Sequence, residues 1–333
     1  MKKIGLVDDP KLHKHPAIIH TKPIPRGGSI PLFLGAFIAA LIFIPLTKTL
    51  TAILFASFLA LTIGLIDDRL NAKSKDASVY LRFLINILAA VIVVGSGISI
   101  HFITNPFGGI LNLDKIIIPF LFFQFHLSDI ISVIWLVWIM NMLNWSKGVD
   151  GQMPGIVAIS AIVIGILSLR LNPTGMENFI DAKLSFIIAG SALGFLLFNF
   201  YPAKIFPGYG ATSLYLLLGV TSILSSAKLA TAMLVMGVPF IDFIFTIIRR
   251  ILNKRSPFNG DKKHLHHLLL KLGFSQRKIA LFYWALSAIL GIVALLLESR
   301  SKIFAMIMVG IVMVGALFFL HAITKNINEK TPT

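Results

Sequence analysis

The chain has 333 residues, of which 56% are hydrophobic and 13% charged, and its formal net charge is +16 at pH 7. A mean hydropathy of +0.87 excludes an ordinary soluble domain, and the lack of cysteine excludes disulfide and thiolate chemistry. The positive charge does not indicate nucleic acid, because membrane proteins concentrate Lys and Arg in their cytoplasmic loops. The first residues, MKKIGLVDDPKLHKHP, lack the apolar core of a signal peptide.

Apolar runs long enough to cross a bilayer, about 20 residues each, recur along the whole chain. The predicted spans are 29–47, 50–66, 79–100, 129–145, 155–170, 183–200, 212–226, 228–248, 278–297 and 302–322. Segment 116–127 is apolar but too short to span, so we expect a re-entrant or interfacial piece there. The predicted fold is all-α: one polytopic membrane domain over residues 1–333, with about ten transmembrane helices.

The distribution of charge predicts the orientation. With both termini cytoplasmic, most of the 30 Lys and Arg residues fall in inner loops, as the positive-inside rule requires. The loop 249–277, which contains a histidine cluster, is then cytoplasmic too. Transporters more often place polar groups near the bilayer midplane. Because the polar stretches here gather on one face, the pattern favours an enzyme acting on a water-soluble substrate and a lipid headgroup over a transporter or channel.

Two adjacent carboxylates, Asp67 and Asp68, end an apolar run in the sequence LTIGLIDDRL. Such a pair repels itself unless water, a cation or Arg69 compensates. Mg²⁺ is commonly held by one or two carboxylates together with substrate phosphates, so the pair suits a metal ligand beside a base or orienting group. An ordinary solvated helix end explains the same residues, and the pair alone does not decide between these interpretations.

Cationic candidates occur in two loops. The sequence DKKHLHH suits a pyrophosphate better than zinc, because Zn²⁺ usually takes four ligands; a basic loop near anionic lipid headgroups is the alternative. Its histidines are His264, His266 and His267. In KPIPRGG, Arg26 precedes two glycines that would let backbone amides approach an anion, although a plain turn before a helix has the same pattern.

Asp242 lies inside the apolar run GVPFIDFIFTIIRR. An ionisable residue in such a run is a functional candidate. It lies about two helical turns before Arg249, close to the predicted cytoplasmic end, so a structural hydrogen bond is an equally good interpretation.

Five stretches occur together in this chain: GLVDDP with PIPRGG, GLIDD, NMLN with GVDG, NFYPAKIF, and VPFIDFIF followed by RRILNKRSPFNGDKKHLHH. Over nearly the whole chain they resemble the polyprenyl-phosphate N-acetylhexosamine-1-phosphate transferases, glycosyltransferase family 4. The last stretch resembles the N-acetylglucosamine-1-phosphate branch more than the muramoyl-pentapeptide branch.

The resemblance implies transfer of a sugar-1-phosphate, here N-acetylhexosamine-1-phosphate, from a UDP-sugar to polyprenyl (undecaprenyl) phosphate, with release of UMP. The setting implied is the cytoplasmic face of a bacterial inner membrane and the synthesis of cell-envelope polysaccharides. Magnesium, or manganese in its place, is the implied cofactor, and a homodimer is the implied assembly. A catalytically altered homologue that binds lipid phosphate or nucleotide is the alternative.

The resemblance also implies site residues. Asp67, Asp68 and Asp150 would be catalytic, with Asp67 positioning or activating the lipid phosphate, and Asp68 and Asp150 would hold the metal. The histidines would hold the pyrophosphate, and two asparagines would line the uridine cleft with Asp150. The residues assigned to substrate binding are Asn141, Asn144, Lys147, Asn199, Tyr209, Arg82, His264, His266, His267 and Arg26.

Two positions depart from the family pattern. Lys147 stands where the family has the first aspartate of D-G-L-D-G, and Tyr209 stands where it has the aspartate of M-G-D. A unit-charge pair about 4 Å apart is worth about 4 kcal/mol at an effective dielectric of about 20, so an ammonium beside Mg²⁺ is costly. Lys147 either points away, or binds phosphate as a point charge in place of the metal, or marks a chain that no longer catalyses.

Overall fold

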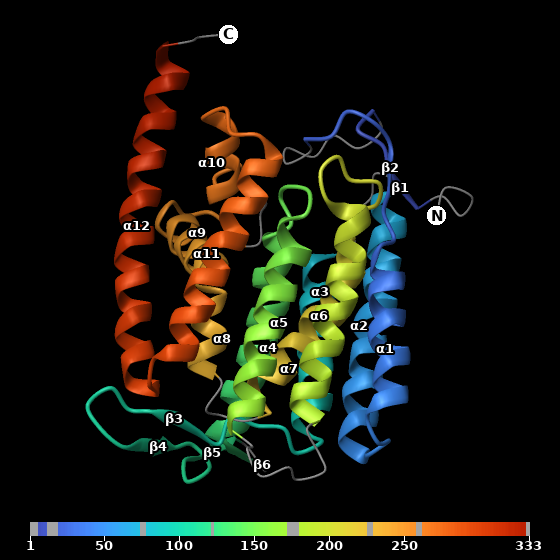
Figure 1. Ribbon diagram of the computed structural model, residues 1–333, viewed down its shortest axis with the longest axis vertical. Helices are drawn as coiled ribbons and strands as arrows, with labels where there is room; N and C mark the ends of the chain where they lie inside the picture. Colours follow the sequence, from blue (N-terminus) through green and yellow to red (C-terminus); the bar gives the residue numbers. More distant parts are fainter. Residues whose placement is uncertain are drawn as a thin grey trace.

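The computed structural model describes residues 6–11, 19–73, 78–120, 123–171, 180–224, 229–257 and 262–330. The middle of the first polar stretch and part of the 249–277 loop lie outside these residues. The chain forms a bundle of upright helices (Figure 1). The helices are α1 Ser29–Phe43, α2 Lys48–Asn71, α3 Val79–Val94, α4 Leu127–Trp145, α5 Gln152–Leu171, α6 Ile180–Asn199, α7 Thr212–Ile223, α8 Leu229–Val235, α9 Gly237–Leu252, α10 Leu265–Lys271, α11 Gln276–Leu296 and α12 Ser299–Lys330.

Long apolar helices make this a multi-pass membrane protein. Among the described residues, six helices are long and apolar enough to cross a bilayer, and a bent pair could supply a seventh span. The six are α2, α4, α5, α6, α11 and α12. Three shorter apolar helices, α1, α3 and the one containing α7, coincide with the remaining predicted spans. The total of ten crossings stays a prediction.

Helix α7 lies at the centre of the bundle, and all of its residues are buried. It contacts α2, α4 and α6. A helix that is apolar on every side is expected to be enclosed by other helices. Helix α7 is short because it begins only after loop 200–208, which comes from the site described below. Helix α12 is the opposite case: little of its apolar span is buried.

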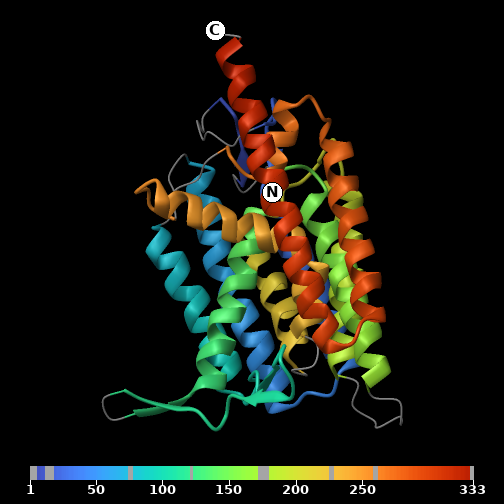
Figure 2. The same ribbon diagram turned by 90° about the vertical axis from the view of Figure 1, so that its left-hand side faces the viewer.

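The predicted span over 228–248 corresponds to two helices joined at a sharp bend. Helices α8 and α9 meet at Met236 with a bend of 82°, and α9 lies across the bundle (Figure 2). Gly237 and Pro239 occupy the first turn of α9, and a proline there costs little because that N–H has no helical partner. The break turns the polar face of α9, with Asp242 and Arg250, toward the protein.

Short strands add to the predicted all-α fold, in three two-stranded antiparallel pairs. They are β1 Val7–Asp8 with β2 Ile24–Pro25, β3 Phe102–Thr104 with β4 Ile110–Asn112, and β5 Ile117–Phe120 with β6 Phe123–His126. The short segment 116–127 is therefore mainly an extended hairpin and does not span. The pairs β3–β4 and β5–β6 lie at one end of the bundle, the hairpin end, and β1–β2 lies at the other, the site end (Figure 1).

Candidate active site

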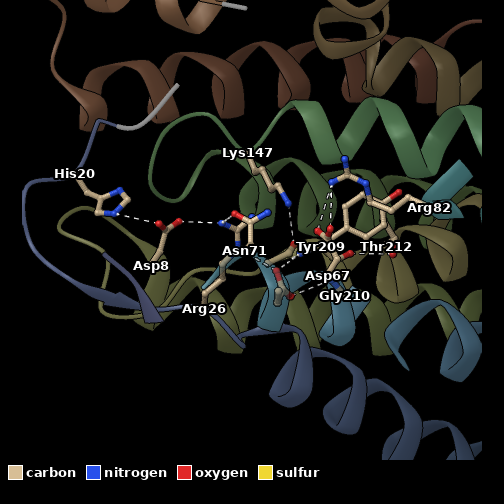
Figure 3. Close-up of polar contacts among 12 residues, drawn as sticks. Asp8, His20, Arg26, Asp67, Asn71, Arg82, Lys147, Tyr209, Gly210 and Thr212 are labelled. Atoms are coloured by element: carbon tan, nitrogen blue, oxygen red, sulfur yellow. Dashed lines mark hydrogen bonds and ion pairs between the residues drawn. The ribbon is translucent and has the colours of Figure 1, made fainter. Parts of the chain in front are cut away.

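Polar side chains from distant segments meet at the site end. They come from the last turn of α2, from the residues after β2, from the first turn of α3, from loop 146–151 and from the short 3-10 helix Tyr209–Ala211 that follows loop 200–208. Figure 3 shows Asp67, Arg26, Arg82, Lys147 and Tyr209 converging on one small region. Four of the five polar stretches singled out in the sequence therefore contribute to one place, or lie directly beside it.

Asp68 is the most enclosed acid of this group, with none of its surface exposed. Its Oδ1 accepts hydrogen bonds from Arg26 Nε at 3.0 Å and Tyr209 N at 2.8 Å, and its Oδ2 accepts one from Gly210 N at 3.4 Å. Gly208 has a φ of +69°, and a Cβ there would lie 2.1 Å from Asp68 Oδ2. Glycine is therefore required for the backbone to wrap this carboxylate.

Arg26 lies between two acids and is not part of a plain turn. Besides Asp68, its guanidinium donates from Nη1 to Asp8 Oδ2 at 2.9 Å and to Asn71 Oδ1 at 3.0 Å. His20 Nε2 lies 3.8 Å from Asp8 Oδ1. Sequence reasoning missed Asp8, His20 and Asn71 as site residues. The available signals were the VDDP motif and the spacing of Asn71, one helical turn after Asp67.

Asp67 pairs with Arg82, which the resemblance assigns to substrate binding and which lies in the first turn of α3. Arg82 Nη1 lies 3.3 and 3.4 Å from the two carboxylate oxygens of Asp67, which is 1% exposed. The guanidinium carbon also lies 5.2 Å from the centre of the Tyr209 ring. The two adjacent aspartates thus each have an arginine, which removes the repulsion expected of an uncompensated pair.

Lys147 points into the site (Figure 3). Its Nζ donates to Gly208 O at 2.8 Å and lies 5.9 Å from the centre of the Tyr209 ring. Burial lowers the pKa of Lys147 to about 7; the charges of Arg26 and Arg82 act in the same direction, and those of Asp68 and Asp67 oppose it. The alternative in which this lysine turns out to solvent is wrong.

Tyr209 is buried and has a partner of its own. Asn86 Nδ2 donates to its hydroxyl at 3.1 Å, and its ring lies within reach of both Arg82 and Lys147. The position that the resemblance gives to an aspartate therefore carries a neutral phenol between two cations. Asn86 was also missed, because a single asparagine in an apolar helix has no distinctive spacing.

Asp150 and Asn199 belong to a neighbouring set of contacts, which we call the loop brace. Asp150 Oδ2 accepts from Ala203 N at 2.9 Å, and its own N–H donates to Gln276 Oε1 at 3.1 Å. Asn199 Oδ1 accepts from Gly151 N at 3.1 Å, and Nδ2 donates to Ile205 O at 2.8 Å. Partial burial raises the pKa of Asp150. Both side chains hold loop 146–151 against loop 200–208, which indicates a positioning role.

The two asparagines of α4 differ in what they offer. Asn141 Nδ2 donates to Val137 O at 2.8 Å within its own helix. Asn144 Oδ1 is buried and accepts no hydrogen bond from any described residue. Asn144 thus keeps an acceptor that no described residue uses, and its assignment to the uridine cleft stays a prediction.

The histidine cluster lies beside the loop that carries Lys147. His264 Nδ1 contacts Asp242 Oδ2 at 2.8 Å, which confirms the structural hydrogen bond considered for Asp242. The ring of His266 stacks on that of His264, with 5.6 Å between centroids, and a Cβ on Gly148 would lie 1.8 Å from His266 Nε2. Burial, with the charges of His267 and His264, holds the pKa of His266 well below its usual range, so this imidazole is neutral near pH 7.

The residues present do not fit the expected magnesium site. Asp68 and Asp150 make separate sets of contacts, and the hydrogen bonds of both carboxylates come from N–H groups. The part of the chain that the structure describes contains no group of three or more His, Cys, Asp or Glu residues able to hold a metal ion. Lys147 and Tyr209 replace two acids at the same place. Magnesium here stays a prediction from the sequence, and the function proposed below uses no step through it.

Fold and site together define a helical membrane protein with a cluster of paired charges at one end, and the chain belongs to glycosyl transferase family 4, which matches residues 50–226. It is 31% identical over 340 residues to a probable undecaprenyl-phosphate N-acetylglucosaminyl 1-phosphate transferase of Bacillus subtilis (strain 168), covering 98% of this chain and 87% of that protein. A decaprenyl-phosphate N-acetylglucosaminephosphotransferase of Mycobacterium leprae is 32% identical over 302 residues, 80% of this chain and 71% of its own. An undecaprenyl-phosphate alpha-N-acetylglucosaminyl 1-phosphate transferase of Yersinia pestis is 26% identical over 333 residues, covering 97% and 85%.

Proposed function

We propose that this protein transfers N-acetylglucosamine-1-phosphate, or a related N-acetylhexosamine-1-phosphate, from a UDP-sugar to polyprenyl phosphate. An oxygen of the lipid phosphate attacks the sugar-bearing phosphorus of the UDP-sugar. The new bond makes a lipid pyrophosphoryl sugar, and the bond to the bridging oxygen breaks, so that UMP leaves. Support comes from the activities for which the relatives are named and from the arginine-paired aspartates at one end of the bundle.

The single observation that carries the chemistry is the Asp67–Arg82 pair beside Lys147. Phosphoryl transfer needs positioned charge around an in-line displacement more than it needs covalent catalysis. Asp67 orients the attacking phosphate or accepts its proton, and Arg82 and Lys147 stabilise the phosphate oxygens. Asp68 is enclosed by its own donors, so its role is to hold Arg26 and the 208–210 backbone in place.

A groove between α1 and α6 supports a lipid acceptor. It has a volume of about 980 Å³, is mostly apolar, and is lined by residues along α6 and by Ile205 at its upper end. Phe206, the next residue, bridges to Arg26, so the groove ends beside the site. A Cβ on Gly194 would meet no atom within 4 Å, so Gly194→Leu adds bulk in the groove without a clash. We expect this variant to raise the KM for polyprenyl phosphate and to leave the KM for the UDP-sugar unchanged; equal changes in both would contradict the groove as the lipid site.

The proposal is tested with membranes containing the protein, radiolabelled UDP-N-acetylglucosamine and polyprenyl phosphate. We expect a labelled product that extracts into organic solvent, together with UMP. No lipid-linked product with any of several UDP-sugars would overturn the transferase assignment. The second candidate is a protein that binds the phosphate substrates without turnover. It is favoured by the Lys147 ammonium and the Tyr209 phenol, which stand where the family pattern has aspartates. Substrate binding with no product is the result that identifies it.

We further propose ten crossings with both termini and the site end in the cytoplasm. The chain contains no cysteine, so single cysteines can be introduced and labelled without background. Phe107 in the β3–β4 hairpin is 96% exposed, and Asn253 follows α9 at the site end. We expect a membrane-impermeant maleimide to label Phe107→Cys in spheroplasts and to label Asn253→Cys only after permeabilisation. The reverse pattern would overturn this orientation.

A further inference from the structure

We propose that the cluster around Lys147 is a metal-independent phosphate-binding site, in which the Lys147 ammonium and the Arg82 guanidinium hold a phosphate or pyrophosphate group. Lys147 thus replaces the divalent cation expected from the resemblance. The identity of the ligand, a nucleotide-sugar or a polyprenyl phosphate, rests on the proposed function. The mode of binding rests on the contacts of the site.

The balance of charge is the first argument. Three carboxylates, those of Asp8, Asp67 and Asp68, face three cations, Arg26, Arg82 and Lys147. When Lys147 is protonated, these charges cancel without any added ion. With aspartates at 147 and 209, five carboxylates would face two arginines, and the net charge of −3 would call for a divalent cation. The two replacements therefore supply by side chain the positive charge that a metal would otherwise supply.

The place of the ammonium is the second argument. Lys147 Nζ is hydrogen-bonded to the carbonyl of Gly208, the residue directly before Tyr209. The positive charge thus lies beside the position where the resemblance places a metal-binding aspartate. A divalent cation at this place would meet an ammonium a few ångströms away, in a partly buried site where screening by water is weak.

Lys147 is also held in place by the loop that carries it. The next residue, Gly148, packs so closely on His266 that a Cβ would overlap the imidazole. The loop brace then fixes the far end of the loop through Asp150 and Asn199. A lysine on a braced loop acts as a preorganised point charge, in contrast to a flexible surface lysine.

Donors remain for a ligand. An ammonium has three N–H groups, and the described residues take one of Lys147's through Gly208 O. Arg82 contacts Asp67 through one terminal nitrogen, and a guanidinium has five N–H groups in all. Both cations approach the ring of Tyr209, at 5.2 and 5.9 Å from its centre, so the two sets of donors lie close enough for one phosphate group to accept from both.

The experiment measures binding apart from turnover. The full chain in nanodiscs is titrated with UMP, UDP-N-acetylglucosamine and short-chain polyprenyl phosphate, each in excess EDTA and again in Mg²⁺. We expect at least one ligand to bind with the same affinity, within about twofold, in both conditions. We expect Lys147→Ala to weaken that binding about 10- to 100-fold, the range for hydrogen bonds to charged groups, and Lys147→Arg to retain most of it.

Two further variants make the result specific. Lys278→Ala removes an exposed lysine at the start of α11 and is the matched control, with affinity expected to stay unchanged. Lys147→Asp combined with Tyr209→Asp restores the acidic pattern and should make binding depend on Mg²⁺. Thermal unfolding of each variant shows whether it is folded, and Lys147→Met, which keeps the length of the side chain without its charge, replaces Lys147→Ala if that variant unfolds.

Wild-type binding that EDTA abolishes and Mg²⁺ restores would overturn the proposal. So would unchanged affinity in both Lys147→Ala and Lys147→Met, or an absence of phosphate binding in every condition. Ligand selectivity separates the sources: UMP and UDP-N-acetylglucosamine binding places the donor at Lys147, and polyprenyl phosphate binding places the acceptor there. If binding is metal-independent but the radiolabel assay gives no product, the phosphate-binding site is supported and only the proposed transferase activity is overturned.

Discussion

The two acidic networks of the site, one around Asp68 and the other the loop brace around Asp150, differ in what surrounds their carboxylates. Asp68 and Asp67 are paired with arginines and lie near Lys147. Asp150 accepts from a backbone N–H and joins two loops. Two aspartates to which the family pattern gives the same role can therefore act differently. Asp68 belongs to a network of paired charges, and Asp150 holds two loops together.

The strongest test of this comparison is Asp67→Asn. If Asp67 orients or deprotonates the attacking phosphate, we expect transfer to fall about 10²- to 10⁴-fold, the usual range for such groups. The asparagine has nearly the same shape but leaves Arg82 without its anion, so we expect some loss of stability, and thermal unfolding shows whether the variant is folded. The rate of labelled lipid product is the measurement, and a rate within threefold of the wild type would show that the pair is not catalytic.

Breaking the ion pair between Arg26 and Asp68 tests how much the Asp68 network contributes to the stability of the fold. Arg26→Met leaves the wholly buried Asp68 carboxylate without its cation. Removing one partner of a buried pair typically costs about 3–5 kcal/mol, and the partial exposure of Arg26 places the expectation near the lower end. Thermal or denaturant unfolding in detergent measures it. Lys204→Met, on an exposed side chain, is the control and should be close to neutral.

Asp150→Asn tests the second of the two networks, the loop brace. The asparagine oxygen can still accept from Ala203 N, so the loop brace loses only the charge on that hydrogen bond, worth about 1 kcal/mol. We expect transfer to fall by less than about tenfold, in contrast to Asp67→Asn. Asp150→Leu, which removes the acceptor, should be worse than Asp150→Asn. A loss in Asp150→Asn as large as that in Asp67→Asn would return Asp150 to the catalytic set.

The smallest expected effect concerns pH and the histidines beside Lys147. The folded-state pKa of His266 lies well below its unfolded value of about 6.5. Below that pH the unfolded chain takes up a proton that the folded chain does not, so stability falls as pH drops, by up to about 1.4 kcal/mol per unit for this group. Unfolding measured between pH 7 and pH 5 should be less pH-dependent in His266→Gln. His101→Gln, on an exposed histidine of the hairpin end, is the control; equal slopes in wild type and His266→Gln would contradict the prediction.

Much of the fold could be read from local patterns. Long apolar runs gave the membrane class and placed most helices within a few residues, because a bilayer demands about 20 apolar residues wherever a straight helix crosses it. The bend at Met236 could not be read in this way, since a continuous run such as 228–248 stays apolar whether or not its helix breaks. The β5–β6 hairpin was likewise open to several shapes, because short apolar runs do not distinguish strand from helix.

For the site, the residue types determined which chemistry to expect. Only the tertiary structure decided which side chains lie in contact. The motifs singled out Asp67 and Lys147, the resemblance added Arg82, and the structure places the three side chains in one region. They could not tell that Lys147 reaches Gly208, 61 residues away, or that Tyr209 N caps Asp68 across 141 residues. Local sequence carries no record of such distances, because the energy of a buried charge depends on partners that only folding brings within a few ångströms.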